Sequence, residues 1–227
     1  MTRIQRLILA CVVLVSALVV LPFPLNATQP TSCDKASICN LESMLSLSSA
    51  LSSVPKPDIT TPEWMKRVVT FTYSVETRGM LTASIAEFKQ QVNATLNDSR
   101  GWQSLGARFN EVASGGNFTI VLAEASWVPS FSPSVCSIVY SCRVGRYVII
   151  NQDRWLGASQ SWNNAGGSLR DYRHMVINHE TGHWLGHGHA ICGGAGQLAP
   201  IMQQQSIDLQ GCAFNAWPLE SELWTNQ

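Results

Sequence analysis

The alternation of apolar and polar residues between positions 68 and 151 predicts three strands and one helix. The run 68–75 is rich in β-branched and aromatic residues and partly alternates, which favours a first strand. Two more apolar runs, 118–122 and 147–151, follow glycine residues and predict further strands. Between the first two strands lies an apolar stripe at spacings of three and four, typical of a helix that faces a core. Its members are Leu81, Ile85, Phe88, Val92 and Leu96.

A second helix is predicted from residue 168 onward. Ser168 follows two glycines and can act as an N-cap, and Asp171 places negative charge at the positive end of the helix. One stripe of this helix leads from apolar residues to histidines, toward a cleft rather than toward solvent. It consists of Tyr172, Met175, Val176, His179 and His183. Little regular structure is evident after His189.

Residues 1–27 have the pattern of a signal peptide or a membrane anchor. Arg3 and Arg6 precede a long apolar run, which a proline-containing segment ends. The protein is therefore expected to be exported. The end of this segment is a poor cleavage site, and residues 7–25 approach the length of a membrane span. Two locations are therefore predicted: secreted, or anchored on the outer face of the cell membrane.

Length and composition leave room for one domain behind a spacer. Residues 28–62 are rich in Ser, Thr and Pro, which predicts a linker or a short propeptide. Residues 63–227 then suit a single domain, which we expect to be a monomer. The 15 Lys and Arg balance the 15 Asp and Glu, so the formal charge is zero. No broad basic surface for nucleic acid is expected.

The cysteines support export. Of the 7 cysteines, Cys11 lies in the leader, and the remaining six form an even set suited to an oxidising compartment. Six cysteines allow fifteen pairings, and we prefer the one that joins neighbours in the sequence. It pairs Cys33 with Cys39, Cys136 with Cys142, and Cys192 with Cys212.

The main chemical signal is histidine clustering, because all 5 histidines fall between positions 174 and 189. His179 and His183 are four residues apart, so they lie on one helix face and can direct imidazole nitrogens at one ion. Glu180 lies beside them, near the water that such an ion would carry. A catalytic zinc site typically has three protein ligands and one water. A third ligand is therefore required.

Two histidines are candidates for this third ligand, His187 and His189. An unbroken helix would carry position 187 about 12 Å along the axis from His179, so the chain must turn after His183. Gly186 and Gly188 can provide that turn, since glycine adopts positive φ without a steric penalty. Geometry alone does not choose between the two candidates.

The spacing His-Glu-x-x-His-x-x-Gly-x-x-His, followed by Met202 in Pro-Ile-Met-Gln, resembles the metzincin zinc peptidases with their Met-turn. The resemblance implies one catalytic Zn²⁺ held by His179, His183 and His189, with Met202 as a hydrophobic floor beneath it. It implies Glu180 as the catalytic base in hydrolysis of a protein or peptide substrate. The fold implied is α+β and metzincin-like. A small mixed β-sheet packs on a long helix and on the zinc-binding helix, before an irregular C-terminal part.

A second resemblance extends the comparison over about the last two-thirds of the chain. The segments 168–189, 200–205 and 211–212 are similar to a family of uncharacterised secreted actinobacterial proteins with this zinc motif. Residues 63–227 are accordingly interpreted as a zinc metallopeptidase-like catalytic domain.

One residue departs from the metzincin pattern. Many metzincins have tyrosine two positions after the Met-turn methionine, and this chain has Gln204. A phenol that stabilises an oxyanion would have to come from elsewhere, such as Tyr140 or Tyr147. Neither of the other two histidines is expected to bind the metal. We interpret His174 as a polar or capping residue, and His187 as a solvated or supporting residue of the turn.

Two alternatives to a peptidase stay open. One is a non-catalytic, zinc-stabilised domain that binds a peptide or a cell-wall fragment. Glu180 argues against it, because a structural site needs no glutamate beside its first histidine and more often closes with Cys or His. The other is a zinc amidase that acts on peptidoglycan peptides, which shares the site chemistry and differs only in its groove.

An alternative to the Cys33–Cys39 disulfide also stays open. Cys33 or Cys39 could cover the zinc as a latency thiolate, as in some metzincin propeptides.

Overall fold

A computed structural model describes residues 68–225, and one mixed sheet of five strands forms the centre of this part of the chain. The strands are β1 (Val69–Arg78), β2 (Ala107–Glu111), β3 (Phe118–Ala123), β4 (Cys142–Val144) and β5 (Tyr147–Asn151). Their order across the sheet is β2-β1-β3-β5-β4. Neighbours are parallel except at one edge, where β4 pairs antiparallel with β5. The three predicted strands are confirmed as β1, β3 and β5, whereas the pattern missed β2 and β4.

Two longer helices pack on the sheet, α2 (Ile85–Leu96) and α5 (Leu169–Leu185). The predicted stripe is confirmed for α2 from Ile85 onward. Leu81 lies before the helix, because Ser84 is the N-cap and its side chain accepts a hydrogen bond from the backbone N–H of Glu87 at 3.3 Å. Two short helices lie between β5 and α5: α3 (Gln152–Gly157) and α4 (Gln160–Asn164). In residues 68–225, three 3₁₀ helices span Trp102–Leu105, Ala125–Ser130 and Glu220–Glu222.

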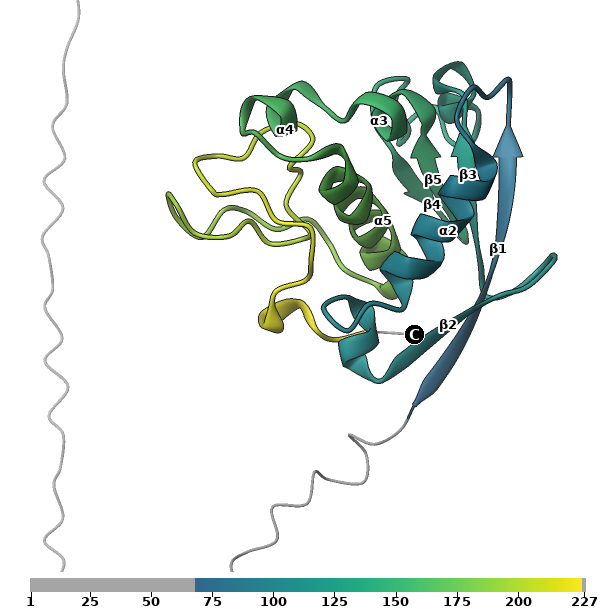
Figure 1. Cartoon of the computed structure of the whole chain (residues 1–227), viewed down its shortest axis with the longest axis horizontal. Helices are drawn as coiled ribbons and strands as arrows, with labels where there is room; N and C mark the ends of the chain where they lie inside the picture. Colours follow the sequence, from purple (N-terminus) through teal and green to yellow (C-terminus); the bar gives the residue numbers. More distant parts are fainter. Residues whose placement is uncertain (1–67, 226–227) are drawn as a thin grey trace, which may run out of the picture. The chain divides into compact units, whose positions relative to one another are not determined.

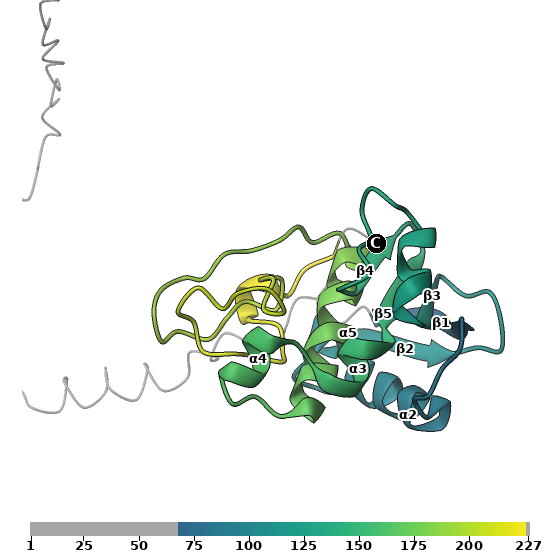
Figure 2. The same cartoon turned by 90° about the horizontal axis from the view of Figure 1, so that it is seen from above.

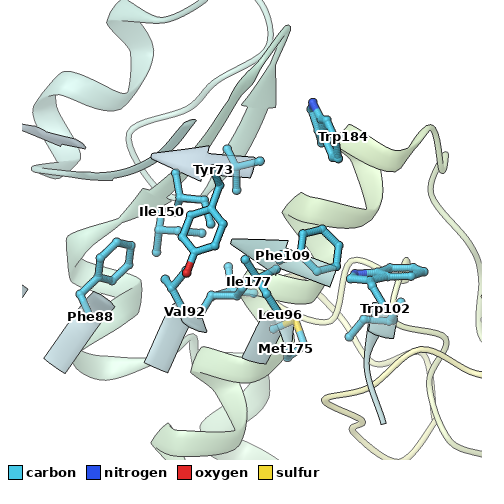
Figure 3. Packing of buried hydrophobic residues seen from close by; sticks show 14 of the residues in the cluster. Tyr73, Phe88, Val92, Leu96, Trp102, Phe109, Ile150, Met175, Ile177 and Trp184 are labelled. Carbon is cyan, nitrogen blue, oxygen red and sulfur yellow. The ribbon is translucent and has the colours of Figure 1, made fainter. Parts of the chain in front are cut away.

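The sheet separates two apolar clusters, because side chains alternate between the faces of a strand. On β3, Ile120 and Leu122 belong to the cluster shared with α2 and α5, whereas Val121 and Ala123 belong to the cluster on the other face. Figure 3 shows part of the larger cluster, where strand and helix residues meet. Among them are Tyr73, Ile150, Phe88, Val92 and Ile177. Burial of this cluster holds α5 against the sheet.

The C-terminal segment, residues 190–225, lies on the side of α5 away from the sheet (Figures 1 and 2). Apart from the 3₁₀ helix Glu220–Glu222 it contains no helix or strand, which confirms the expected irregular C-terminal part. Isolated bridges join Ala190 to Gln203 and Leu198 to Ala213. The α+β class is therefore confirmed: a mixed sheet, two packed helices and an irregular end.

Two of the three predicted disulfides are confirmed. Cys136 and Cys142 are joined at the start of β4, and Cys192 and Cys212 are joined across the C-terminal segment. The predicted pair Cys33–Cys39 lies outside the described residues, as do the leader and the spacer. Within 68–225, every helix is too short or too polar to cross a membrane.

Candidate metal centre

Helix α5 begins and ends where the sequence indicates, which fixes the positions of two histidines. Ser168 is its N-cap, and the side-chain oxygen accepts a hydrogen bond from the backbone N–H of Asp171 at 3.0 Å. Such a cap stabilises a helix by about 1 kcal/mol. At the other end Gly186 adopts a φ of 108°, in the left-handed region that favours glycine. Gly188 has no positive φ, so the turn prediction is correct for Gly186 and wrong for Gly188.

The turn after α5 brings His189 back to His179 and His183. One ring nitrogen from each lies within 4.8 Å of the others. The Nε2 atoms of His183 and His189 are 3.1 Å apart. Two ligands of a tetrahedral zinc ion with bonds of about 2.0–2.1 Å would be about 3.3–3.4 Å apart. His187 lies outside this group, so the structure selects His189 from the two candidates, and the three-histidine group could hold a metal ion.

Backbone carbonyls orient two of the three rings. His179 Nδ1 donates to the carbonyl oxygen of Ile201, and His183 Nδ1 donates to that of His187, each at 2.8 Å. Each Nε2 therefore carries the lone pair that a metal ion needs. Burial, with a smaller contribution from His183, lowers the pKa of His179 to about 3, so this ring is neutral. The chemistry of these donors fits a bound metal cation.

Glu222 fixes the carbonyl that orients His179. Its carboxylate accepts hydrogen bonds from the backbone N–H groups of Ile201, Met202 and Leu219 at 2.8–2.9 Å. Glu222 is buried, with a relative residue exposure of 8%. Sequence analysis did not assign this residue, because nothing in the local pattern shows that residue 222 returns to residues 201–202.

His187 supports the site through its backbone and its ring. The ring is buried between two indoles, with centroid distances of 4.9 Å to Trp102 and 3.8 Å to Trp224. Its Nε2 donates to the carbonyl oxygen of Trp224 at 2.8 Å. The expectation of a solvated residue is wrong, and the alternative of a supporting residue is correct. The reason is the C-terminal segment, whose Trp224 covers the turn.

His189 is positioned by the segment that contains Met202. The backbone N–H of the next residue, Ala190, donates to the carbonyl oxygen of Met202 at 3.0 Å. Met202 is almost fully buried, and a side chain at Gly182 would collide with its sulfur. The Met202 side chain thus packs against α5 one residue before His183. The disulfide Cys192–Cys212 further restrains the chain after His189.

Glu180 and the three histidines line one cleft of about 550 Å³. Glu180 is buried, and burial raises its pKa to about 8. The cleft is closed on one side by α5 and on the other by β4 and the loop that precedes it. Its further lining includes Tyr140, Ser141, Arg143, Gln204 and Ser206. A buried carboxyl group thus lies next to three histidines that could hold a metal ion, in a space large enough for part of a peptide.

The structure separates the two tyrosines considered as a phenol source. Tyr140 lines the cleft, whereas Tyr147 packs on Phe131 with a ring distance of 5.7 Å and is absent from the lining. Tyr172, which also belongs to the predicted α5 stripe, is buried and shares a hydrogen bond with Ser206 at 2.8 Å. Gln204 is exposed in the cleft, at the position where many metzincins have tyrosine.

His174 lies outside the three-histidine group, as predicted. Its Nδ1 is 2.8 Å from the hydroxyl oxygen of Thr95, and its ring lies on Trp217 at a centroid distance of 4.8 Å. The guanidinium of Arg100 covers the same indole at 4.2 Å. His174 thus helps to join α5 to α2 and to the C-terminal segment.

Fold and site together define an α+β protein whose three-histidine group could hold a metal ion beside a cleft. The chain belongs to a family described as "Protein of unknown function (DUF3152)", whose model matches residues 48–218. A search of curated proteins and a search of solved structures both give no match.

Proposed function

We propose that this protein is a zinc-dependent peptidase of the metzincin type, secreted or tethered to the outer face of the cell membrane. The observation that carries the proposal is that Glu180 and the three histidines line the same cleft. A site that only stabilises a fold gains nothing from a buried carboxyl group beside its ligands, because burial of a charged carboxylate costs free energy. In a hydrolase the same group has a chemical role.

The division of roles follows from the position of each group. His179, His183 and His189 would hold one Zn²⁺, which when bound polarises a scissile carbonyl and lowers the pKa of a water toward about 7. Glu180 takes the proton of the attacking water and passes it to the leaving amine. Burial raises the pKa of Glu180 to about 8, and the positive charge of a bound Zn²⁺ would lower it toward the range in which the group can both accept and donate a proton near neutral pH.

The surrounding residues keep this arrangement fixed. Ile201 and His187 hold two imidazoles by their carbonyl groups, and Glu222 holds the segment that contains Ile201. Tyr140 lines the cleft and is the tyrosine available to donate a hydrogen bond to the developing oxyanion. In this proposal Tyr140 replaces the tyrosine that many metzincins carry where this chain has Gln204. The two disulfides agree with an oxidising, extracellular environment.

The test uses the full-length chain produced under oxidising conditions, with zinc content measured by elemental analysis. We expect one zinc ion per chain in the wild type and in Glu180→Gln, and loss of zinc in His183→Ala and His189→Ala. His174→Gln is the matched control, since this histidine is not a ligand, and it should retain zinc. Screening against peptide pools should give cleavage by the wild type and His174→Gln, with a loss of at least about 100-fold in Glu180→Gln.

The screen includes proteins, short peptides and peptidoglycan stem peptides, because the rival functions differ in substrate. Cleavage of peptidoglycan stem peptides, and of no other pool, would mean that the protein is a cell-wall amidase and not a general peptidase. Equal zinc in the wild type and Glu180→Gln, with no cleavage of any pool by either, would favour a non-catalytic binding domain. A wild-type protein without zinc would overturn the metal site itself.

A further inference from the structure

One cation in the cleft has no role in the mechanism above. Among the described residues that line the cleft, Arg143 is the single arginine or lysine, and Glu180 is the single aspartate or glutamate. Arg143 is absent from the ion pairs of the described chain. Its Nε–H is buried and has no hydrogen-bond partner. A buried donor without a partner costs free energy, so its retention calls for an explanation.

Strand β4 places the Arg143 side chain on the same side of the sheet as the three-histidine group. Its neighbours on β4, Cys142 and Val144, pack in the smaller apolar cluster on the face away from α5. Because side chains alternate along a strand, Arg143 points to the opposite face, where α5 lies. Arg143 also lines the same cleft as His183 and the other two histidines. Arg143 is therefore near the metal group but separate from its ligands.

Arg143 does not serve as a counterion for Glu180. The ion pairs of the described chain include none between Arg143 and Glu180. Four other arginines of the described chain have partners. Arg78, Arg100 and Arg173 pair with carboxylates, and Arg146 donates to two backbone carbonyls. The cleft thus holds a guanidinium that is paired with no carboxylate of the described residues.

We propose that Arg143 binds a carboxylate of the substrate and makes the cleft selective for peptides with a carboxylate close to the cleaved bond. A guanidinium matches a carboxylate through two parallel hydrogen bonds, and partial burial strengthens this interaction. The carboxylate is either an Asp or Glu side chain or the free C-terminus of a short peptide. The inference rests on the proposed function, because it names the substrate class of the same cleft.

The experiment compares matched peptides with the zinc-loaded, full-length protein. One set exchanges Glu for Gln at each position near the cleavage site, and a second set exchanges a free C-terminus for an amide. We expect kcat/KM to be about 10- to 100-fold higher for the charged member of one set, as for a charge-assisted hydrogen bond. The set that shows the preference identifies the source of the carboxylate. Equal rates within both sets would overturn the proposal.

Variants separate a specificity role from a structural or catalytic one. Arg143→Gln should remove the preference by slowing cleavage of the charged peptide, while the neutral peptide is cleaved within about threefold of the wild-type rate. Arg143→Glu should instead favour peptides with Lys at the same position. Arg154→Gln is the matched control, since Arg154 also has a buried, unpartnered Nε but does not line the cleft. Equal loss for charged and neutral peptides in Arg143→Gln, or loss of the preference in Arg154→Gln, would contradict the proposal.

A binding measurement keeps this result distinct from failure of the peptidase proposal. Zinc-loaded Glu180→Gln is titrated with the same peptide pairs, and the dissociation constants are determined by calorimetry. Tighter binding of the charged peptides, abolished by adding Arg143→Gln, supports the carboxylate site even where no pool is cleaved. Cleavage without any charge preference in binding or rate overturns the carboxylate site and leaves the peptidase intact.

Discussion

At the scale of single residues, the site depends on groups that the motif does not contain. The motif identifies His179, Glu180, His183 and His189, because their spacing along one helix and one turn is visible in the sequence. Glu222 was not predictable, since two of its partners, Ile201 and Met202, lie about twenty residues earlier and depend on the path of an irregular segment. Thr95, the partner of His174, was not predictable either, because it lies on α2 and its contact with α5 depends on how the two helices pack.

Replacement of Glu222 by glutamine should weaken the metal site. Glutamine has the same shape, but its NH₂ group would face a backbone N–H where Glu222 now accepts hydrogen bonds. The carbonyl that orients His179 would shift, and we expect zinc affinity to fall about 10- to 100-fold, as for other groups that orient metal ligands. Competition with a fluorescent chelator measures this. Glu220 is an exposed residue of the same turn, so Glu220→Gln should leave the zinc affinity unchanged. An equal loss of affinity in Glu220→Gln and Glu222→Gln would exclude a specific role of Glu222 in orienting His179.

The stability of the protein should depend on pH through His174. Burial, followed by the charge of Arg170, lowers the pKa of this ring below 6.5, so the ring is neutral in the folded protein. Below about pH 6.5 the unfolded chain binds a proton that the folded chain does not, so stability falls as the pH falls. Denaturant unfolding from pH 7.5 to 5.5 should show that the wild type loses more stability than His174→Gln. Parallel losses in the two proteins would contradict a neutral His174.

At the scale of elements, prediction succeeded where burial imposes a period and failed where strands are short. The helix α2 and the strands β3 and β5 pack against the core, so their apolar residues repeat visibly. Strand β2, Ala107–Glu111, has only two buried residues among polar ones, and β4 is three residues long. Both lie at sheet edges, where one side lacks a partner strand and the pattern is weak. Strand β4 forms part of the cleft wall and carries Arg143, so the sequence pattern missed an element that contributes to the candidate site.

The end of α5 gives a test of the turn that brings the third histidine to the site. Gly186→Ala should destabilise the protein by about 1 kcal/mol, because alanine is strained at a φ of 108°. Zinc affinity should fall with it, since His189 follows this turn. Gly188→Ala is the matched control: its φ is not positive and a Cβ there meets open space. It should change stability by less than about 0.5 kcal/mol. Similar losses for the two variants would show that the turn does not depend on Gly186.

At the scale of the whole molecule, the three-histidine group joins two parts with different order. His179 and His183 belong to α5, which packs on the sheet, whereas His189 belongs to the irregular segment after it. The core therefore fixes two ligands, and local bonds fix the third. These bonds are the hydrogen bond from Ala190 to Met202, the hydrogen bond from the Met202 N–H to the Glu222 carboxylate, and the Cys192–Cys212 disulfide. A metal ion bound here would cross-link the segment to the core.

Removal of the proposed zinc ion should therefore loosen residues 186–215 more than the sheet. A ligand present at about 100 times its dissociation constant stabilises the bound state by about 2.7 kcal/mol, and a chelator removes this contribution. Hydrogen exchange with and without chelator should show faster exchange in this segment, while β3 and β5, buried at the centre of the sheet, keep their protection. His189→Ala should exchange like the chelated wild type and be insensitive to chelator, and added zinc should restore the wild type alone. Faster hydrogen exchange in the sheet as well as in the segment would mean instead that the metal holds the whole domain together. Unchanged exchange after chelation would mean that the disulfide and Glu222 are sufficient to hold the segment.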